Sequence, residues 1–437
     1  MMKQILLLGA GKSATVLIDY LKANAAENDW KVFVADNDLS VAQLKVGMHD
    51  SVKAVQLDIQ NEDGRKKLIQ QADIVISMMP PSLHYAVAMD CIEFNKHLLT
   101  ASYIDPKIKN EDLKIKDKGL TFLCEMGLDP GIDHMSAMQI IHRIKNEGGK
   151  IISFKSHCGG LVAPENDDNP WHYKISWNPR NVVTAGKAGA LYKEHNQIIE
   201  KKYESLFENC KQVEIEGLNN LAYYPNRDSL SYIPLYELEE AETFVRTTLR
   251  YPSFCKGWKY IVDLKLTDEE KKYQTKSLSF AQFFQDYFNE QHRQEILKDA
   301  MRNESIAQQL NFLGLFDNES INKNECSVAD VLQILLEKKL VLQKEDRDLI
   351  VMLHEIEYEI NGKKKSIKSS LIVKGDDHFR TAMAKTVGLP LGIAAKLILE
   401  GKIKESGLHI PIIPTIYEPV LDELKKMGIV FQEKVMS

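Results

Sequence analysis

Residues 9–14, GAGKSA, have the types and spacing that bind nucleotide phosphates. The segment fits the pattern G-x-G-x-x-G/A and directly follows an apolar run, 4–8, that predicts a strand. Gly9 permits a tight turn, Gly11 lets the backbone approach a pyrophosphate, and Ala14 allows the next helix to pack closely on the sheet. The free N–H groups at that helix N-terminus would hold the phosphates. We therefore predict a dinucleotide site here, in preference to a glycine-rich turn without a ligand.

Asp36 stands at the end of a second predicted strand, 31–36, 22 residues after Ala14. A carboxylate at this position can accept hydrogen bonds from the adenosine ribose hydroxyls, and its charge repels a 2′-phosphate. We therefore expect NAD as the cofactor and keep NADP as the alternative. A carboxylate that only caps the following turn would not distinguish the two. Asp58 ends the third predicted strand, 53–58, where it either lies near the adenine or belongs to a solvated turn.

Residues 77–84, SMMPPSLH, end a fourth predicted strand at the carboxyl edge of the sheet, where open α/β folds bind ligands. Met78 and Met79 suit core packing, and their polarizable side chains also suit a nicotinamide ring. Pro80 stops the strand. His84 falls in the first turn of the next helix, where a cofactor contact competes with a solvated surface histidine.

A parallel sheet must position these residues, and the first 105 residues alternate short apolar runs with helix-like stretches as βαβ units do. Strands covered on both faces are apolar throughout, and six runs fit this description. They are 4–8, 31–36, 53–58, 73–78, 97–102 and 120–125. The pattern predicts an α/β dinucleotide-binding fold.

After residue 150 the regular alternation of strand-like and helix-like segments ends. Residues 151–270 contain β-rich stretches, such as 258–266, and many of the prolines, which is typical of an inserted α+β substrate domain. Residues 271–349 are polar and helical, with a long helical stretch at 282–310, and predict a small helical insert. The 437 residues are enough for two or three domains.

Two features of the last ninety residues predict specific local structures. Asn361-Gly362 lies between the β-like runs 350–360 and 367–375 and predicts a hairpin turn. Residues 379–401 predict a buried helix, and their glycines and proline predict a break near 388–390.

Composition excludes several classes of protein. The net charge is −6 with the signs interspersed, so we expect no nucleic-acid partner. Runs such as 72–81 are too short to span a membrane, and the N-terminus enters a strand without a leader, so we expect a cytoplasmic protein with no membrane partner. Six cysteines spread singly read as reduced thiols, and because His and Cys never converge at ligand spacing we expect no metal site.

Four clusters of residues are more polar than a hydrophobic core requires. Together with the glycine segment, they resemble the motifs of a known family. The clusters are 102–103 (SY), 127–134 (GLDPGIDH), 156–180 (with SHCGGLVAPENDDNP and YKISWNPR), and 225–229 (PNRDS) with 243–250 (TFVRTTLR). Together with GAGKSA, MMPPSLHYAVA and TAMAKTVGLPLGIAAKLIL, this order resembles the saccharopine dehydrogenases of the L-glutamate-forming type, also called saccharopine reductases. The likeness runs from residue 4 to about residue 425.

The resemblance implies an oxidoreductase of lysine metabolism that interconverts saccharopine, NAD(P)+ and water with L-glutamate, 2-aminoadipate 6-semialdehyde and NAD(P)H. It implies a discontinuous Rossmann-type dinucleotide-binding domain with an inserted α+β substrate domain and a small helical subdomain. We place these at 1–130 with 378–437, at 131–270 with 350–377 (also the dimerisation domain of an expected homodimer), and at 271–349.

The resemblance also implies roles for individual residues. The substrate, a small amino-acid derivative, would contact Ser102, Tyr103, Arg227, Thr248, Leu249 and Arg250. Leu128 and Trp177 would lie toward the cofactor and the cleft. Together with the residues assigned above from motif and strand position, the predicted cofactor contacts are Gly9, Gly11, Lys12, Ser13, Ala14, Asp36, Asp58, Met78, Met79, Pro80, His84, Leu128 and Trp177. Family members that work in lysine synthesis usually prefer NADP and lack an acid at the end of strand two, so Asp36 is a departure from the pattern.

The sequence also contains cationic residues suited to the carboxylates of saccharopine. Three carboxylates need forked cationic donors, which Arg227, Arg250 and Arg180 could supply; each could instead pair with a surface acid. Arg246 and Arg250 share a face whether their segment is a helix or a strand.

Hydride removal beside a secondary amine, followed by imine hydrolysis, moves a proton at each step. The candidates for this work are Asp129, Tyr103, Cys158 and His134. Asp129 precedes Pro130 and a helix, so it could be only an N-cap, and Cys158 could be a small buried filler that shapes the cleft. We favour Asp129 and Tyr103.

Two other functions were weighed. A carboxynorspermidine dehydrogenase of the same superfamily would show extra acids where Arg227 and Arg250 stand. A catalytically silent NAD(P)-binding protein would keep Gly9 and Gly11 but lose the polar clusters, which are all present.

Overall fold

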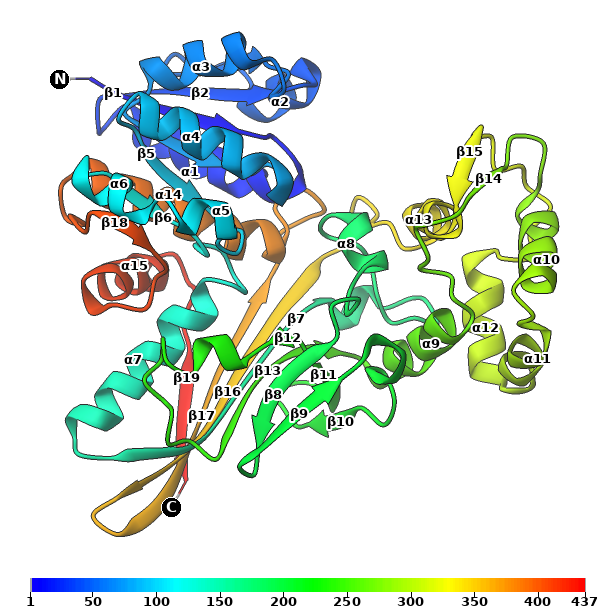
Figure 1. The fold of residues 1–437 in the computed structure, drawn as a ribbon. Helices are drawn as coiled ribbons and strands as arrows, with labels where there is room; N and C mark the ends of the chain where they lie inside the picture. The colour runs from blue at the N-terminus through cyan, green and yellow to red at the C-terminus, as the bar shows by residue number, and fades with distance from the viewer. Residues whose placement is uncertain (1, 437) are drawn as a thin grey trace. The chain divides into compact units, whose positions relative to one another are not determined.

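The computed structural model describes residues 2–436, and the chain divides into two compact units, whose elements are labelled in Figure 1. The first unit contains the residues up to Gly149 together with Phe379–Gln432. The second contains Lys150–His378 and the segment from Glu433 onward. This division differs from the expected boundaries: 131–149 falls in the first unit, and 271–349 is not separated from the second.

The first unit is built on a seven-stranded parallel sheet in the order β18-β6-β5-β4-β1-β2-β3. Its strands are β1 (Lys3–Leu8), β2 (Trp30–Asp36), β3 (Val52–Gln56), β4 (Ile74–Ser77), β5 (His97–Thr100), β6 (Thr121–Leu123) and β18 (Gly407–His409). The six predicted N-terminal strands are therefore present, and the order reverses between β1 and β4, as at the ligand-binding switch point of a Rossmann fold. The prediction of a Rossmann-type α/β fold is confirmed.

Helices connect successive strands from β1 to β6, because parallel strands need crossover connections. The helices of this unit are α1 (Thr15–Ala25), α2 (Leu39–Val46), α3 (Glu62–Gln71), α4 (His84–Glu93), α5 (Pro106–Lys109), α6 (Asp112–Asp117), α7 (Ile132–Asn146), α14 (Ala382–Leu399) and α15 (Pro414–Lys426). Short 3₁₀ turns, η1 (Lys12–Ala14) and η2 (Pro81–Leu83), precede α1 and α4.

Helix α14 runs without the predicted break, with Pro390 inside it. Its glycines serve packing against α1 instead: a Cβ at Gly388 would lie 2.9 Å from the Leu17 nitrogen, and one at Gly392 would lie 2.5 Å from Tyr20 Cδ1. By length and composition α14 could cross a membrane, but 78% of it is buried inside the protein, as in the core helix of a globular domain. The buried helix predicted for 379–401 is therefore confirmed.

The second unit contains a ten-stranded sheet whose main path is β10-β11-β13-β7-β16-β17-β19. The strands on this path are β7 (Lys150–Val162), β10 (Lys211–Val213), β11 (Leu221–Pro225), β13 (Thr243–Arg250), β16 (Asp348–Ile360), β17 (Lys363–Lys374) and β19 (Gln432–Met436). Strands β8 (Ala190–Glu194), β9 (Gln197–Lys201) and β12 (Arg227–Asp228) attach beside β13. The predicted hairpin is correct: Asn361 and Gly362 both have positive φ, 51° and 70°.

Helices and a small two-stranded sheet complete this unit: α8 (Pro179–Val183), α9 (Pro252–Asp263), α10 (Phe280–Glu290), α11 (Gln294–Arg302), α12 (Glu304–Leu313), α13 (Val328–Lys339), β14 (Lys272–Gln274) and β15 (Glu325–Ser327). One prediction was wrong. The β-like stretch 258–266 lies largely in α9, which buries Phe254, Trp258 and Ile261 in an aromatic core. The helical character predicted for 282–310 is confirmed, and this stretch is divided among three helices.

Candidate functional site

The glycine loop has the geometry that the sequence predicted. Gly9 has φ +96°, and a Cβ there would lie 3.2 Å from the Met78 carbonyl oxygen, so the tight turn requires glycine. A Cβ at Gly11 would meet no protein atom within 4 Å, which leaves the backbone open to a ligand. Ala14 is buried at the start of α1, while Lys12 is exposed and Ser13 half-buried. These residues fit a bound dinucleotide phosphate.

Asp36 is held by the backbone of this loop. Its Oδ2 accepts the N–H of Ala10 at 2.7 Å, and its Oδ1 accepts the N–H of Asp38 at 3.0 Å. Lys45, from α2, donates to the carbonyl of Gly11. Burial lowers the pKa of Lys45 to about 8, although the negative charge of Asp36 opposes this effect. The acid at the end of β2 therefore organises the loop and has a cation beside it.

The other predicted cofactor residues of this unit occupy different settings. Asp58 accepts the N–H of Gln60 at 2.9 Å. This bond favours the second interpretation of Asp58, a residue of a turn. Met78 and Met79 are half-buried after β4, with the Met79 sulfur near Gly9, and Pro80 is exposed. Leu128 is buried.

His84 is not the solvated histidine that we considered, since only 3% of it is exposed. Its Nδ1 lies 2.9 Å from Ser77 Oγ, and its Nε2 lies 2.8 Å from Ser102 Oγ and 3.2 Å from Thr100 Oγ1. Burial lowers its pKa to about 4, so the ring is neutral at pH 7. His84 thus connects the carboxyl ends of β4 and β5, including a predicted substrate residue, Ser102.

Asp129 is not the N-cap of α7. That helix begins at Ile132 with Gly131 as its cap, and the carboxylate that accepts the Gly131 N–H, at 2.6 Å, belongs to Asp133. Asp129 is half-buried in the loop before the helix, and Tyr103 is half-buried in the loop after β5. Pro130 lies before the cap rather than in the first turn. The capping interpretation of Asp129 was therefore wrong.

A buried acid near these loops was missed by our sequence analysis. Glu125 lies between β6 and α7, and its Oε2 is 2.8 Å from Nε2 of His134, which is fully buried. The available signal was the spacing of an acid and a histidine at either end of 125–134. That signal is weak because the intervening loop, not helical periodicity, brings them together.

In the second unit, Arg250 is a buried cation on β13, with 4% of its surface exposed. Its guanidinium carbon lies 5.2 Å from the ring centroid of Tyr173 and 5.5 Å from that of Phe254, and Nη1 donates to the Leu249 carbonyl at 2.7 Å. Its Nε has no hydrogen-bond partner, and within residues 2–436 no carboxylate forms an ion pair with it. Such a site is prepared for an anion.

Other predicted residues gather around Arg250. Trp177 is half-buried, and its Nε1 donates to Tyr173 Oη at 3.1 Å. Cys158 is buried on β7 opposite Thr248, which is half-buried on β13. The side chain of Leu249 belongs to an apolar cluster with Leu161 and Val351, so it supports the strand.

Two further arginines of the second unit differ in exposure. Arg227 is exposed, has φ +54° and pairs with β8 through its backbone. Arg246 is buried, with its guanidinium carbon 4.6 Å from the ring centroid of Tyr232. Arg246 and Arg250 therefore share a strand, the second of the two geometries that we considered.

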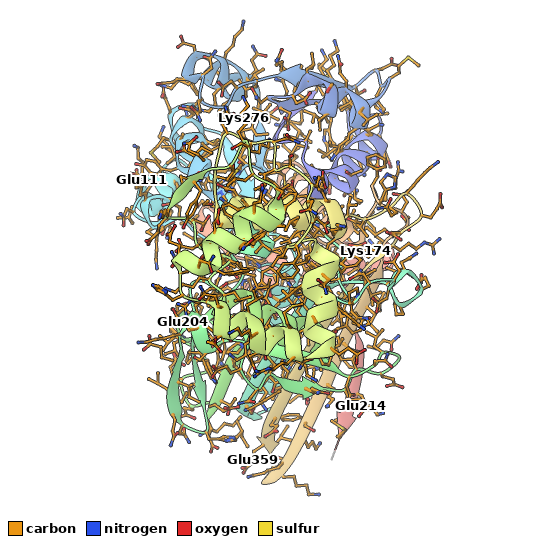
Figure 2. The ribbon with its side chains drawn as sticks, turned by 90° about the vertical axis from the view of Figure 1, so that its right-hand side faces the viewer. Glu111, Lys174, Glu204, Glu214, Lys276 and Glu359 are labelled. Atoms are coloured by element: carbon orange, nitrogen blue, oxygen red, sulfur yellow. The ribbon has the colours of Figure 1, made fainter. Side chains whose placement is uncertain are left out.

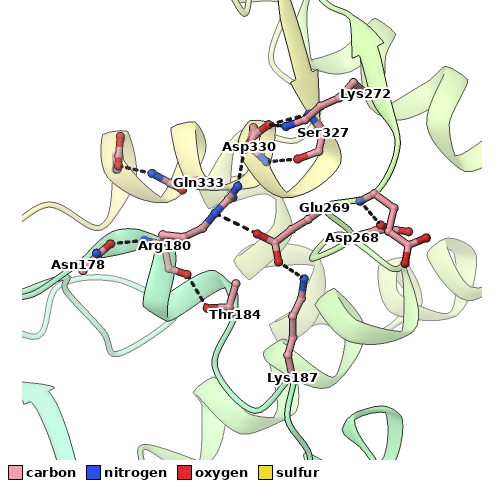
Figure 3. Close-up of polar contacts among 12 residues, drawn as sticks. Asn178, Arg180, Thr184, Lys187, Asp268, Glu269, Lys272, Ser327, Asp330 and Gln333 are labelled. Atoms are coloured by element: carbon pink, nitrogen blue, oxygen red, sulfur yellow. Dashed lines mark hydrogen bonds and ion pairs between the residues drawn. The ribbon is translucent and has the colours of Figure 1, made fainter. Parts of the chain in front are cut away.

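Arg180 pairs with acids of the protein, which was the alternative to binding a substrate carboxylate. Its Nη2 lies 2.6 Å from Asp330 Oδ1, and its Nε lies 3.2 Å from Glu269 Oε1. Figure 3 shows the guanidinium of Arg180 between these two acids. Each of these acids also binds a lysine: Lys187 lies 2.6 Å from Glu269, and Lys272 lies 2.6 Å from Asp330. Lys174, labelled in Figure 2, is likewise engaged, at 2.9 Å from Asp168 and 2.7 Å from Asp346. These cations are occupied by protein carboxylates.

A Rossmann sheet with a phosphate-binding loop, in a chain that also holds an unpaired buried arginine in an α+β unit, defines a dinucleotide-dependent oxidoreductase. Across residues 2–436 no three His, Cys, Asp or Glu side chains gather to hold a metal. Residues 5–123 match the saccharopine dehydrogenase NADP binding domain, and residues 127–429 match the saccharopine dehydrogenase C-terminal domain. The chain belongs to the saccharopine dehydrogenase family, as its motifs indicated.

Similar proteins span the whole chain. The NADP(+)-dependent, L-glutamate-forming saccharopine dehydrogenase of Saccharomyces cerevisiae is 35% identical over 449 residues, covering 100% of both sequences. The alpha-aminoadipic semialdehyde synthase of Arabidopsis thaliana is 34% identical, but this chain spans only 44% of its length. The solved apo structure of the yeast L-Glu-forming enzyme covers 100% of both chains with a TM-score of 0.89.

The expectation of NAD was wrong. The matching domain is an NADP binding domain, and the fungal relatives from Saccharomyces cerevisiae and Pyricularia oryzae are NADP(+) enzymes. The structure gives a physical reason: the Asp36 carboxylate that we assigned to the ribose is bound to the N–H groups of Ala10 and Asp38.

Proposed function

We propose that this protein is an NADP-dependent saccharopine dehydrogenase of the L-glutamate-forming type, acting in lysine metabolism. The reaction converts saccharopine, NADP+ and water into L-glutamate, 2-aminoadipate 6-semialdehyde, NADPH and a proton. Family membership and full-length similarity to enzymes with this name support the proposal. The cytoplasmic location and the homodimer stay predictions.

The observation that carries the proposal is the state of Arg250. A buried guanidinium normally has a carboxylate partner, because an uncompensated buried charge costs several kcal/mol. Arg250 has a free Nε and aromatic neighbours instead. One of the three carboxylates of saccharopine would supply the missing anion, and exposed Arg227 offers a second forked donor.

The glycine loop would hold the cofactor. Backbone N–H groups of residues 11–13 and the N-terminus of α1 would bind the pyrophosphate. Lys45 and exposed Lys12 would favour a 2′-phosphate. When bound, the nicotinamide supplies the hydride acceptor for the carbon that bears the secondary amine.

Side chains of this protein would transfer the protons of the reaction. The amine loses a proton, water adds to the imine, and the carbinolamine collapses as the glutamate nitrogen gains a proton. We assign these transfers to Asp129 and Tyr103, which lie in loops at the carboxyl edge of the sheet, where ligands of such folds bind. Cys158, buried on β7, would shape the substrate cleft.

The test is direct. Purified protein is mixed with saccharopine and NADP+ or NAD+, the reduced nicotinamide is followed by absorbance, and glutamate is identified as a product. We expect turnover with a higher kcat/KM for NADP+. No turnover with either cofactor, while NADPH still binds, would reject the function.

A further inference from the structure

Glu125 is a buried carboxylate for which the reaction above has no role. Only 4% of it is exposed, and it lies two residues after Leu123, the last residue of β6. Its φ is +54°, a left-handed conformation that residues other than glycine and asparagine rarely adopt. A glutamate at such a position persists only where surrounding contacts determine it.

The contacts of Glu125 join two segments. Its Oε1 accepts the N–H of Ile104 at 3.3 Å, directly after Tyr103, and its own N–H donates to the carbonyl of Ser102 at 3.0 Å. Its Oε2 meets Nε2 of His134, in the first turn of α7, at 2.8 Å. One carboxylate therefore connects the loop of Tyr103 with the helix that follows Asp129.

The loop that carries Asp129 is closed by hydrogen bonds between its own residues. The N–H of Gly127 donates to the carbonyl of Pro130 at 3.0 Å, and the N–H of Ile132 donates to the carbonyl of Gly127 at 2.9 Å. A Cβ at Gly131 would lie 2.1 Å from the Gly127 oxygen. Because these bonds hold the loop to itself, its placement relative to the rest of the sheet depends on its two ends, which the contact between Glu125 and His134 joins.

We propose that Glu125 is a positioning residue, which fixes the Tyr103 loop relative to the Asp129 loop through the bonds to Ile104 and His134. The inference rests on the proposed function. The relevant property is the length of the side chain, since two partners on opposite sides must be reached at once. A displacement of about 1 Å in a catalytic group can cost roughly 10²-fold in rate.

Two conservative variants separate length from charge. Glu125→Gln keeps the length: its oxygen can accept from Ile104, and its amide can donate to His134. Glu125→Asp keeps the charge but withdraws the carboxylate by about 1.5 Å, the length of one C–C bond. We expect Glu125→Gln to keep kcat within about three-fold of the wild type, and Glu125→Asp to lose at least about ten-fold, with NADPH affinity unchanged in both.

The matched control is Asp90→Asn, which weakens the buried ion pair of Asp90 with Arg65, 2.6 Å long, in the same unit. It should lower the unfolding temperature and leave kcat unchanged. His134→Asn, too short to reach Glu125, checks the other end and should lower kcat as Glu125→Asp does, even if the Glu125 variants fail to fold.

A double-mutant comparison tests whether Glu125 acts through Asp129. In an Asp129→Asn background, Glu125→Asp should cost much less than its ten-fold effect in the wild type. Equal kcat for wild type and Glu125→Asp, or a loss in Glu125→Gln as large as in Glu125→Asp, would overturn the positioning role. A wild-type protein that does not oxidise saccharopine would instead reject the proposed function, and this inference with it.

Discussion

The carboxylate of Asp36 accepts the backbone N–H of Ala10 at 2.7 Å across 26 residues of sequence. This bond connects the end of β2 to the glycine loop, and the other oxygen of Asp36 accepts the N–H of Asp38. An acid at this position is usually interpreted as a ligand of the ribose. Here its bonds to the loop and the neighbouring Lys45 make it compatible with a 2′-phosphate.

Lys45 should make NADP+ binding depend on pH. Its pKa of about 8 means that the ammonium is protonated below pH 8 and neutral above it. A 2′-phosphate is attracted only by the protonated form, so affinity for NADP+ should fall as pH rises from 7 to 9, while affinity for NAD+ should not. Titration calorimetry measures the affinity for each oxidised cofactor. Lys45→Gln should remove the difference, and an unchanged pH dependence in this variant would exclude the lysine.

Arg250→Met should separate function from stability. It removes a buried charge without a carboxylate partner and keeps an apolar side chain of similar length, so the unfolding temperature should be unchanged or higher. We expect kcat/KM for saccharopine to fall by about 10- to 150-fold, which corresponds to about 1.5–3 kcal/mol for a hydrogen bond to a charged group. Steady-state kinetics with saccharopine varied and thermal unfolding provide the two values.

Arg180→Met is the matched control for this experiment. It breaks pairs with Asp330 and Glu269, so it should reduce stability and leave the KM for saccharopine unchanged. If Arg250→Met lowered the unfolding temperature and left kcat/KM for saccharopine unchanged, Arg250 would have a structural role. Arg227→Ala should raise the KM for saccharopine, because exposed Arg227 would lose its forked donor to a substrate carboxylate.

Asp129→Asn should lower kcat by roughly 10²–10⁴-fold, the usual contribution of a general acid or base. Because Asp129 does not cap α7, the variant removes no helix cap, and thermal unfolding measured beside kcat separates a loss of stability from a loss of catalysis. The pH profile of kcat should lose one limb. Full kcat with an unaltered profile would remove Asp129 from the mechanism, and Cys158→Ser should retain activity if that thiol only shapes the cleft.

His84 should make the first unit sensitive to acid. Its pKa is about 4 in the folded chain and about 6.5 when unfolded, so the unfolded state binds the extra proton between these values. Its contribution to stability is fully present above pH 6.5 and is lost as pH falls toward 4, by about 3 kcal/mol in all. Urea unfolding from pH 4 to 7 measures the slope, which should be smaller in His84→Gln. Equal slopes would show that His84 does not titrate in this way.

Much of the fold followed from local pattern. Apolar runs covered on both faces marked the six strands of the first unit, and GAGKSA between a strand and a helix marked the phosphate loop. Asn361-Gly362 marked the hairpin because its backbone conformation is a local property. The polar motifs were specific enough to indicate the family, because long runs of unusual residues rarely recur by chance.

Tertiary structure decided which partner each polar group meets. Local pattern could not show that Arg180 pairs with Asp330, 150 residues away, while Arg250 lacks an acid, or that Asp36 bonds to the loop it was expected to accompany. It favoured a break at Pro390, but packing of Gly388 and Gly392 against α1 stabilises a continuous helix. Periodicity and turn chemistry are set by neighbours in sequence, whereas ion pairs, burial and pKa values are set by neighbours in space.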